Sequence, residues 1–554
     1  MNPHASIKCA GRLLMALAAI ASIVFAAGCG SSSSAPPPNN TGFSVANLKG
    51  TYVISIAGED LDAIDDIVPF AIAGTITTDG NGNIAAGTVD INDPYNVGVH
   101  IGEPFPASTY TVGPDGRGHA TLSTSVGPIN LDFVLTSGNH GLITLYNTTG
   151  SGSGTIDLQV GATQTSLVSL AFSLSGADPD GNPLGTVGAF TLNSSGIIAA
   201  GGGVEDINDN GDSSASGTAG LQLTGGSLVL NPAGTSGTAL LTSANAGFSS
   251  LGFDVWVIDS THLKFIENDT AATGVLLAGD AFTQQTAFPA SGQLVFTVGG
   301  ADSSGDPLAA GGYVTTNASG TLSAGIEDFN DAGSVVPERG FSGSCATFTA
   351  GRCQLDMSGF TNLTFAAYPS SGGVLLLEND SNSLAIVQGA AYAQTATSFD
   401  AAQGYGLNLS GANTAGNGEV DDIAQFNTSG TSKCTNMTGI VDENDLGGTP
   451  QPFGEALCGT YTPDPIDGAE GRGLISVNTP GTYLGALNLE YYVIDSSTAL
   501  FLDVDAFDLY NGQAAQLGAG VFGLQNASTD SAAPRHAIAI VHPAVRSRAA
   551  MRRK

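Results

Sequence analysis

Four copies of one pattern run through this chain of 554 residues, and this repetition limits the folds open to it. Each copy begins with an apolar segment that ends in a glycine: YVISIAG at Gly58, LAFSLSG at Gly176, LVFTVGG at Gly300 and YGLNLSG at Gly411. The residues two, four and six positions before each glycine are apolar. Such alternation is typical of a β-strand with one buried face.

Three further markers follow in a constant order. About thirty residues after the glycine stands an Asp-x-Asn-Asp sequence, as in GTVDIND and GVEDIND. Next comes a Gly-Arg step, which the second copy lacks: Arg117, Arg352 and Arg472. Each copy then ends in a hairpin and a strand that closes at a glutamine: Gln159, Gln284, Gln394 and Gln525. This constant order indicates four tandem repeats.

The spacing of strands and turns predicts an all-β fold. Each repeat holds roughly eight short strands separated by glycine-rich turns, without helical periodicity, which suits a small antiparallel barrel or sandwich. A unit of about 110–125 residues is long enough for a core of its own. We expect four tandem antiparallel β-barrel or β-sandwich repeats, at residues 45–160, 161–286, 287–396 and 397–527.

The N-terminus carries a secretory signal in residues 1–28. Lys8 and Arg12 precede an apolar run that is short for a membrane span, and the run ends in FAAGC at Cys29. Small residues directly before a cysteine resemble a bacterial lipobox, which implies cleavage before Cys29 and acylation of this residue. Several acyl chains would anchor the protein firmly. The alternative is an ordinary signal peptide with a chance cysteine.

Residues 29–44 are rich in serine and proline and predict a flexible tether between the lipid and the first repeat. Gly30 stands where inner-membrane retention signals carry Asp, so the resemblance implies the outer membrane or cell surface, with the membrane as a partner. The basic tail, residues 528–554, is expected to be disordered. Contact of this tail with lipopolysaccharide phosphates or with the acidic body is the alternative.

The body of the chain is very acidic. Of 15 Lys and Arg, two lie in the signal and six in the last twenty residues, which leaves seven against 49 Asp and Glu. This excess repels phosphates and excludes nucleic acid as a partner. Two explanations stay open: divalent cations neutralise some carboxylates, or the protein works in acidic surroundings where fewer carboxylates are ionised.

Four cysteines remain in the mature chain besides Cys29, an even number for an oxidising compartment. The simplest pairing is Cys345 with Cys353 and Cys434 with Cys458. A metal site is the rival interpretation, but the spacings fit no zinc pattern and histidines are absent nearby. Two disulfides are therefore favoured.

Through these markers, residues 45–527 resemble tandem-repeat secreted bacterial lipoproteins with glycine-rich, all-β repeats. The marker that carries the resemblance is Gly-[Ile/Val]-x-Asp-x-Asn-Asp. The resemblance implies the fold and the address, and it brings no known activity.

The Asp-x-Asn-Asp sequences are the candidate site, because carboxylate and amide oxygens in close spacing suit Ca²⁺. We predict them to lie in turns, and Asp and Asn also cap tight turns without any metal. The closing Glu of a calcium loop is missing, although Glu267 with Asp269, or Glu378 with Asp380, could supply oxygens. The candidate ligands are Asp90, Asn92, Asp93, Asp206, Asn208, Asp209, Asn210, Asp212, Asp328, Asn330, Asp331, Asp442, Asn444 and Asp445.

Other candidate chemistry is sparse. His140 and His262 occupy equivalent hairpin positions, which favours a structural role. Recurring acid pairs such as Glu205 with Asp206 argue against glycoside hydrolysis, because a catalytic pair is needed once. The single tryptophan, Trp256, is either a stacking platform for a sugar or a packing residue. No nucleophile elbow, zinc-protease motif or phosphate loop occurs in the sequence.

These observations predict a protein that is not an enzyme. No cofactor is certain, and Ca²⁺ is the candidate. Its expected role is binding, adhesion or structure at the cell envelope, with a glycan or an envelope protein as partner. A calcium-stabilised module that binds carbohydrate or protein is the second hypothesis, and an enzyme of polysaccharide turnover is the third.

Overall fold

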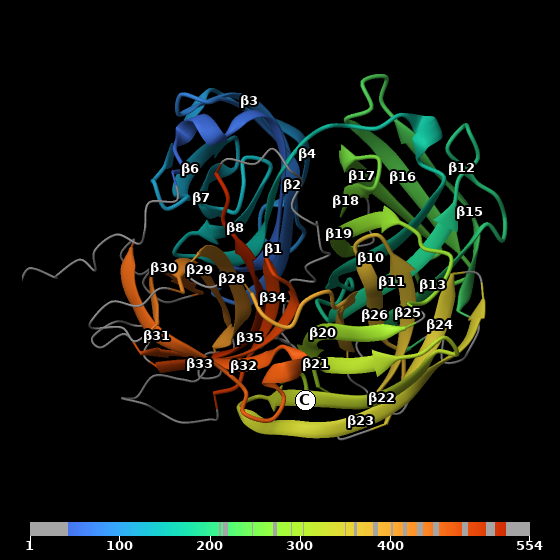
Figure 1. Cartoon of the computed structure of the whole chain (residues 1–554). Coiled ribbons are helices and arrows are strands. Elements are labelled where there is room, and N and C mark those ends of the chain that lie inside the picture. The colour runs from blue at the N-terminus through green and yellow to red at the C-terminus, as the bar shows by residue number, and fades with distance from the viewer. Residues whose placement is uncertain are drawn as a thin grey trace, which may run out of the picture. The chain divides into compact units, whose positions relative to one another are not determined.

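In a computed structural model, the repeats fold into four antiparallel β-barrels that follow one another along the chain (Figure 1). The structure describes residues 42–209, 212–213, 220–245, 247–269, 274–289, 291–302, 304–349, 351–358, 363–380, 386–399, 403–413, 418–428, 436–446, 454–478, 486–505 and 516–527. In each barrel eight strands pair into a closed cylinder, and no sheet extends from one barrel into another. The all-β prediction is confirmed, and the fold is a barrel in all four repeats.

The strands of barrel 1 are β1 (Lys49–Leu61), β2 (Ile67–Asp79), β3 (Asn83–Asp93), β4 (Gly98–Phe105), β5 (Ser108–Val112), β6 (Arg117–Thr124), β7 (Gly127–Leu135), β8 (His140–Tyr146) and β9 (Gly150–Leu158). Those of barrel 2 are β10 (Ser169–Ala177), β11 (Pro183–Thr191), β12 (Ile197–Ile198), β13 (Gly203–Asp209), β14 (Asp212–Ser213), β15 (Leu221–Leu230), β16 (Ser236–Ser243), β17 (Ser250–Asp259), β18 (His262–Glu267) and β19 (Leu276–Thr283). The strands β4, β12 and β14 pair outside the closed cylinders of eight strands.

Barrel 3 consists of β20 (Gly292–Ala301), β21 (Pro307–Thr316), β22 (Thr321–Asp331), β23 (Ser334–Thr349), β24 (Arg352–Ser358), β25 (Thr364–Ser370), β26 (Gly373–Glu378) and β27 (Ile386–Ala393). Barrel 4 consists of β28 (Gly404–Asn413), β29 (Gly418–Asn427), β30 (Met437–Asp445), β31 (Glu455–Pro463), β32 (Arg472–Asn478), β33 (Ala486–Asp495), β34 (Thr498–Asp503) and β35 (Gln516–Leu524). Three single-turn 3₁₀ helices occur in the described residues: η1 (Val45–Asn47), η2 (Gln164–Ser166) and η3 (Gly468–Glu470). None of the described helices has the length and apolar character of a membrane span.

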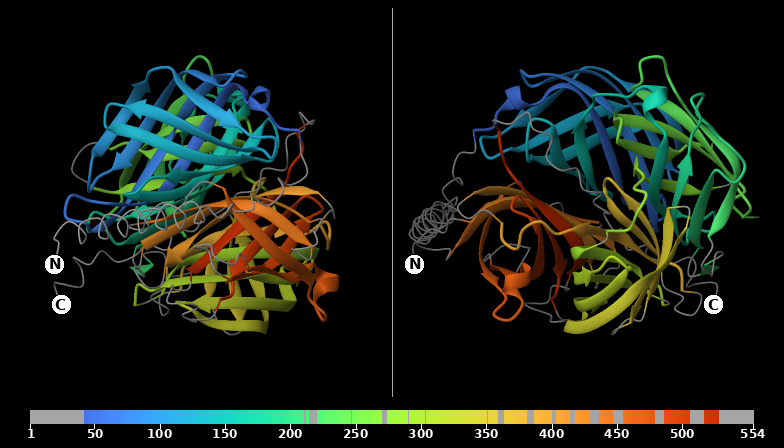
Figure 2. Two further views of the ribbon diagram at one scale, coloured as in Figure 1. Left: turned by 90° about the vertical axis from the view of Figure 1, so that its left-hand side faces the viewer. Right: turned by 45° about the vertical axis from the view of Figure 1, so that its right-hand side comes forward.

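Each barrel is filled by its own apolar core. The alternating residues of the first strands supply part of it, as Tyr52, Ile54 and Ile56 do in β1. The residue between them, Ser55, belongs to the opposite face of the strand, because side chains of a strand alternate. The walls of the barrels can be followed from two further sides in Figure 2.

The marker glycine near the end of each first strand allows the barrel to close. In every repeat it lies beside the last strand of the same barrel, so that Gly58 pairs with Gly152 and Gly411 with Gly518. A Cβ atom would lie 2.0 Å from the Ser151 carbonyl oxygen at the first position and 2.3 Å from that of Leu517 at the second. Both distances are shorter than any real contact, so a side chain would force the first and last strands apart.

The barrels also pack on one another in a closed cycle. The first strands of one barrel, such as β10 and β11, contact the last strands of the next, such as β25 and β26. Barrel 4 contacts barrel 1 in the same manner through β28 and β29 against β7, β8 and β9. We call each contact a seam and name it by its barrels: seams 1–2, 2–3, 3–4 and 4–1. The closed cycle is called the ring.

The two ends of the ring meet. The Asn47 side-chain amide, before β1, donates a hydrogen bond of 3.1 Å to the carbonyl oxygen of Ala527, after β35. The backbone NH of Asn526 donates to the Thr136 carbonyl oxygen at 2.7 Å. At seam 4–1 the start and the end of the described chain therefore lie side by side, and non-covalent contacts join them.

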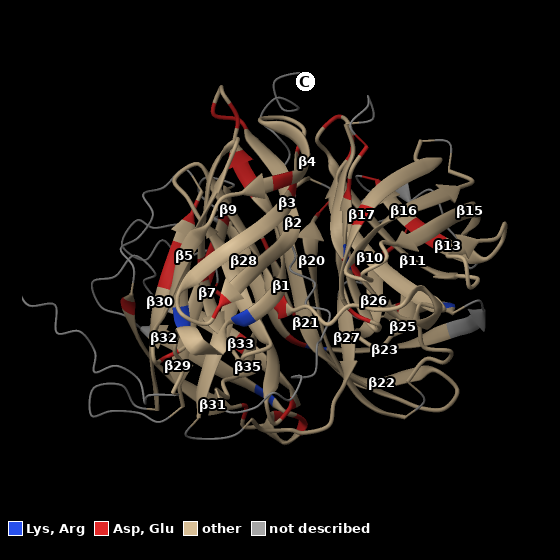
Figure 3. Ribbon diagram, turned by 90° about the horizontal axis from the view of Figure 1, so that it is seen from above, with Lys and Arg blue, Asp and Glu red and all other residues tan. Residues whose placement is uncertain are grey.

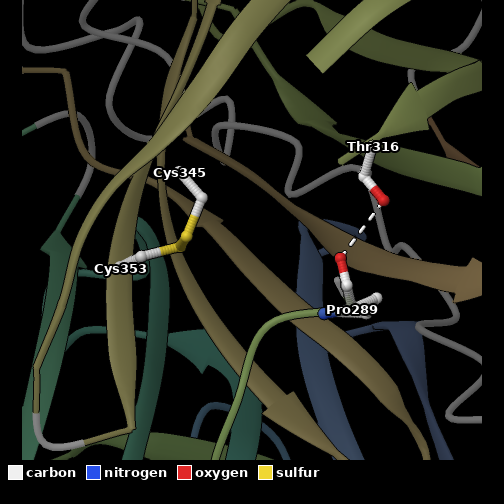
Figure 4. The surroundings of a disulfide bond; sticks show 4 residues. All are labelled: Pro289, Thr316, Cys345 and Cys353. Carbon is white, nitrogen blue, oxygen red and sulfur yellow. Dashed lines mark hydrogen bonds between the residues drawn. A yellow bond between two sulfur atoms is a disulfide. The ribbon is translucent and has the colours of Figure 1, made fainter. Parts of the chain in front are cut away.

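A disulfide joins β23 and β24 in barrel 3, as predicted, between Cys345 and Cys353 (Figure 4). Cys458 of β31 is disulfide-bonded, and its predicted partner, Cys434, lies outside the described residues.

Removal of this disulfide by Cys345→Ala with Cys353→Ala should lower the free energy of unfolding by about 2–3 kcal/mol. The crosslink closes a short loop and restricts the unfolded chain, which gives this magnitude in the chain-entropy model. Urea unfolding of the double variant, followed by circular dichroism, measures the change against the parent protein. An unchanged unfolding midpoint would contradict the estimate.

Candidate functional site

The Asp-x-Asn-Asp markers lie at the ends of strands β3, β13, β22 and β30. This corrects the prediction that they form turns. Asp and Asn have low strand propensity, which favoured turns in the sequence. Here the first Asp and the Asn of each marker are buried. The Asp accepts a hydrogen bond from the neighbouring barrel and the Asn donates one to it, so tertiary contacts override local preference. Each marker belongs to one seam.

In seam 2–3 the first Asp of the marker binds the Gly-Arg arginine of the following repeat. The Arg352 guanidinium donates to both carboxylate oxygens of Asp206, at 2.6 and 2.7 Å. The Tyr368 hydroxyl donates to the same carboxylate at 2.6 Å. All three side chains are buried. A two-point bond between an arginine and a carboxylate is strong and directional.

Seam 3–4 repeats this arrangement. The Arg472 guanidinium donates to both carboxylate oxygens of Asp328, at 2.9 Å each, and the Tyr492 hydroxyl donates to one of them at 2.5 Å. In seam 4–1 the arginine is present, since Arg117 lies 2.8 Å from Asp442. Val134 takes the place of the tyrosine there, because Arg117 pairs with Val134 as Arg472 pairs with Tyr492.

Seam 1–2 is built differently. The indole NH of Trp256 donates to Asp90 at 2.8 Å. Trp256 pairs with Ser236, so this serine has the strand position that arginine has in the other repeats. In repeat 2 a serine therefore replaces the arginine of the Gly-Arg step, and the tryptophan paired with it binds the marker aspartate instead. Trp256 is a seam residue, packed against Asp90.

The marker asparagines also bind across the seams. Asn92 donates to the Glu267 carboxylate and Asn208 to that of Glu378, each at 2.8 Å. Asn330 donates to the Asp503 carbonyl oxygen at 3.0 Å, and Asn444 to that of Leu145 at 2.7 Å. Three closing glutamines reach backbone carbonyl oxygens of the next barrel in the same way: Gln159, Gln394 and Gln525.

The structure thus distributes the predicted calcium ligands over four seams. Glu267 and Glu378 do lie beside marker residues, but each belongs to the following barrel. Within the described part of the chain, no group of three or more His, Cys, Asp or Glu side chains could hold a metal ion. Asn210 and the anchor position Cys29 lie outside the described residues, and Asp212 lies in β14. Calcium binding stays a prediction, and the described residues offer no such site. The last aspartate of each marker is the final residue of its strand: Asp93, Asp209, Asp331 and Asp445.

A cavity of about 140 Å³ lies where barrels 1, 2 and 3 meet. Its volume is far above the space that one water needs and is similar to engineered cavities that hold a small organic molecule. The outward faces of β1, β9, β10 and β27 supply hydroxyl and amide groups to its wall. These polar lining residues are Ser55, Ser153, Thr155, Ser173, Ser175 and Gln388.

The charged groups of the cavity largely neutralise one another. Lys264 lies 2.7 Å from Asp280, and His262 contacts the same carboxylate oxygen at 2.6 Å. Burial alone would raise the pKa of Asp280, but Lys264 and His262 hold this pKa below its ordinary value. Glu59 completes the set of ionisable lining residues in the described chain. Figure 3 shows how few Lys and Arg lie among the Asp and Glu of the described residues.

Two polar side chains characterise the wall further. The Gln388 amide donates to the Ser173 hydroxyl at 2.5 Å, which joins barrel 3 to barrel 2. The Thr155 hydroxyl is buried and has no hydrogen-bond partner among the described residues. A buried hydroxyl without a partner is costly, so this atom is available to a ligand or to water.

Sequence reasoning did not find this cavity. Its one signal was the polar residue three positions before each marker glycine, where Ser55, Ser173, Thr297 and Asn408 stand. These residues face away from their own barrels. His140 and His262, by contrast, have the expected structural role, since each binds an aspartate: Asp157 at 2.8 Å and Asp280.

Comparison with known proteins adds little. No family model and no curated protein matches the chain. Among solved structures, a variant of transferrin binding protein B from Haemophilus parasuis shares 8% identity over 71% of this chain and 83% of its own, with a TM-score of 0.19. Transferrin binding protein B from Neisseria meningitidis shares 12% identity over 69% and 84%, with a TM-score of 0.18. At such TM-scores the similarity carries no argument about this protein.

Proposed function

We propose that this protein is a lipid-anchored, non-catalytic binding protein of the cell surface, and that the cavity between barrels 1, 2 and 3 holds its ligand. The cavity is the observation that carries the proposal. Its wall needs three barrels, so it exists only when the ring is assembled. The acidic markers, which were the best candidates for chemistry, are occupied by contacts between barrels.

The ring also favours binding over a spacer role. A spacer separates its two ends, and its length grows with the number of repeats. Here Asn47 and Ala527 are hydrogen-bonded, so the four barrels add no distance between the ends. The predicted lipid tether and the basic tail would both leave the ring at seam 4–1.

The wall of the cavity favours a small uncharged ligand with hydroxyl groups, of the sugar or polyol class. Serine and threonine hydroxyls and the Gln388 amide offer hydrogen bonds. Lys264 is already neutralised by Asp280, so an anion would find no available positive charge. Apolar side chains such as Phe70 and Leu276 would pack against the carbon face of the ligand.

The test uses the mature chain with Cys29→Ser, which removes the acylation site. We expect at least one of glucose, galactose, N-acetylglucosamine and trehalose to raise the melting temperature in a saturable manner, because a ligand that binds only the folded state stabilises it. Product analysis should show the sugar unchanged.

Ser175→Phe places a large side chain in the cavity and should weaken binding at least about tenfold. The matched control is Ser123→Phe on the exposed side of β6, which should bind like the parent. Equal binding by the Ser175 variant, or no response to any sugar in the panel, would reject the cavity as the ligand site.

A further inference from the structure

The contacts of the four seams can be compared directly, because equivalent strands of the repeats meet in each seam. Seams 2–3, 3–4 and 4–1 each contain an arginine from the Gly-Arg step bound to a marker aspartate. In seam 1–2 no described arginine contacts Asp90, and Trp256 gives this carboxylate one hydrogen bond. The arginine–aspartate ion pair that joins the barrels at the other three seams is therefore missing among the described residues of seam 1–2.

Like charges meet at one point of seam 1–2. Asp254 of β17 lies near enough to Asp90 to raise its energy when both are ionised. Glu267 of β18 is bound across the seam by Asn92, as Glu378 is bound by Asn208 in seam 2–3, so this contact is common to both seams. The one lysine of β17 and β18, Lys264, is paired with Asp280 of its own barrel.

Apolar packing at seam 1–2 is also the smallest. Its buried cluster contains four described residues: Ala71, Ala73, Ile266 and Leu276. The cluster of seam 2–3 contains nine, with Tyr368 and Phe282 among them. The cluster that extends over seams 3–4 and 4–1 contains fourteen. Since apolar stabilisation follows the buried area, alanines contribute least.

The same small side chains form part of the cavity wall. Ala73 and Leu276 belong both to the cluster of seam 1–2 and to the lining of the cavity, as do Ala57 and Ala278, which are packed against the cluster. Separation of these residues would therefore remove one wall of the cavity directly.

We propose that the ring opens at seam 1–2 and that this opening admits ligand to the cavity. The opening itself follows from the comparison of the seams. The admission of ligand rests on the proposed function. Closed, the seam completes the cavity wall; open, it exposes Ala73 and its neighbours to solvent while the other three seams stay in contact.

The experiment measures how often each seam opens through the reactivity of a buried thiol. Ala71→Cys in β2 and Ala189→Cys in β11 replace fully buried alanines of seams 1–2 and 2–3 that do not line the cavity. Both are made in the mature Cys29→Ser chain, whose background reaction is subtracted. We expect 5,5′-dithiobis(2-nitrobenzoate) to label the first thiol at least about tenfold faster in native buffer, because it reacts only when its seam opens.

Ser236→Arg restores the missing cation at its strand position in seam 1–2. It should slow labelling of the Ala71→Cys thiol about tenfold and leave that of the Ala189→Cys thiol unchanged. Should the indole leave no room for the guanidinium, Ser236→Arg with Trp256→Tyr recreates the full set of seam 2–3. Equal labelling of the two thiols, or no slowing in either arginine variant, would overturn the proposal.

Ligand entry is followed by stopped-flow emission of Trp256, the single tryptophan of the chain, with glucose and N-acetylglucosamine as probes. Ser236→Arg should lower the association and dissociation rates together and leave Kd within twofold, as expected of a gate. Faster labelling at seam 1–2 without sugar binding would reject the proposed function alone. Sugar binding with equal labelling would reject the opening seam alone.

Discussion

Arg352→Met should lower the free energy of unfolding by about 3–5 kcal/mol, the largest effect that we expect from a single substitution. The guanidinium is 2% exposed and the Asp206 carboxylate 0%. Without the arginine the described side-chain donors left to this carboxylate are neutral: Tyr368 and Asn379. A buried charge without its partner has lost its water and gained no compensating charge, and this imbalance is the source of the cost. Urea unfolding followed by circular dichroism measures it.

Two variants test that reason. Arg117→Met in seam 4–1 should cost less, because this side chain is 18% exposed and water can replace part of its contact with Asp442. Arg352→Met combined with Asp206→Leu should recover most of the loss, since replacement of a buried ion pair by apolar groups is often neutral. A loss below about 1 kcal/mol for Arg352→Met alone would show that the pair does not hold seam 2–3.

Stability should fall as the pH rises from about 5 to 8. Burial raises the pKa of Glu205 to about 7, and it raises the pKa values of Glu267 and Glu490 to about 8. These groups hold a proton in the folded protein and lose it on unfolding, where the pKa of Glu is about 4.3. The stability that they contribute is therefore complete below pH about 4 and disappears as the pH passes their folded pKa values.

The opposite sign applies to two aspartates. Burial would raise the pKa of Asp157, but His140, with Lys264 and His262 nearby, holds it below the ordinary value, and Asp280 behaves alike. Their contribution is present above pH about 4 and is lost in stronger acid. We therefore expect maximal stability near pH 5, which agrees with the second explanation of the acidic composition, an acidic environment.

Glu205→Gln isolates one contribution, because glutamine resembles the protonated acid in shape and carries no charge. It should stabilise the protein by about 3–4 kcal/mol at pH 8 and by only about 1 kcal/mol at pH 5. Thermal melts at half-unit steps of pH measure both. A parent protein whose melting temperature is flat or rises between pH 5 and 8 would contradict the burial of these acids in neutral form.

The repeats, the strands and the all-β class could be predicted because they rest on local, periodic signals, whereas the choice between barrel and sandwich was decided by the structure. Alternation around Ile54 and Ile56 places one face of each first strand in a core, and each repeat contains a complete eight-strand unit. The Cys345–Cys353 disulfide was predictable for the same reason, since eight positions separate two residues of one hairpin. In these cases the interacting residues lie within one repeat.

The ring and its cavity were decided by tertiary structure alone. Asp206 and Arg352 lie 146 positions apart, and Arg117 and Asp442 lie 325 apart, so no local pattern joins them. Their partners come from a different repeat. The same Asp-x-Asn-Asp sequence suits a turn as well as a seam, and the sequence therefore predicts turns. The sequence determined the strands and the buried face of each repeat through its period. Which barrel faces which depends on side chains that meet only after the barrels have formed.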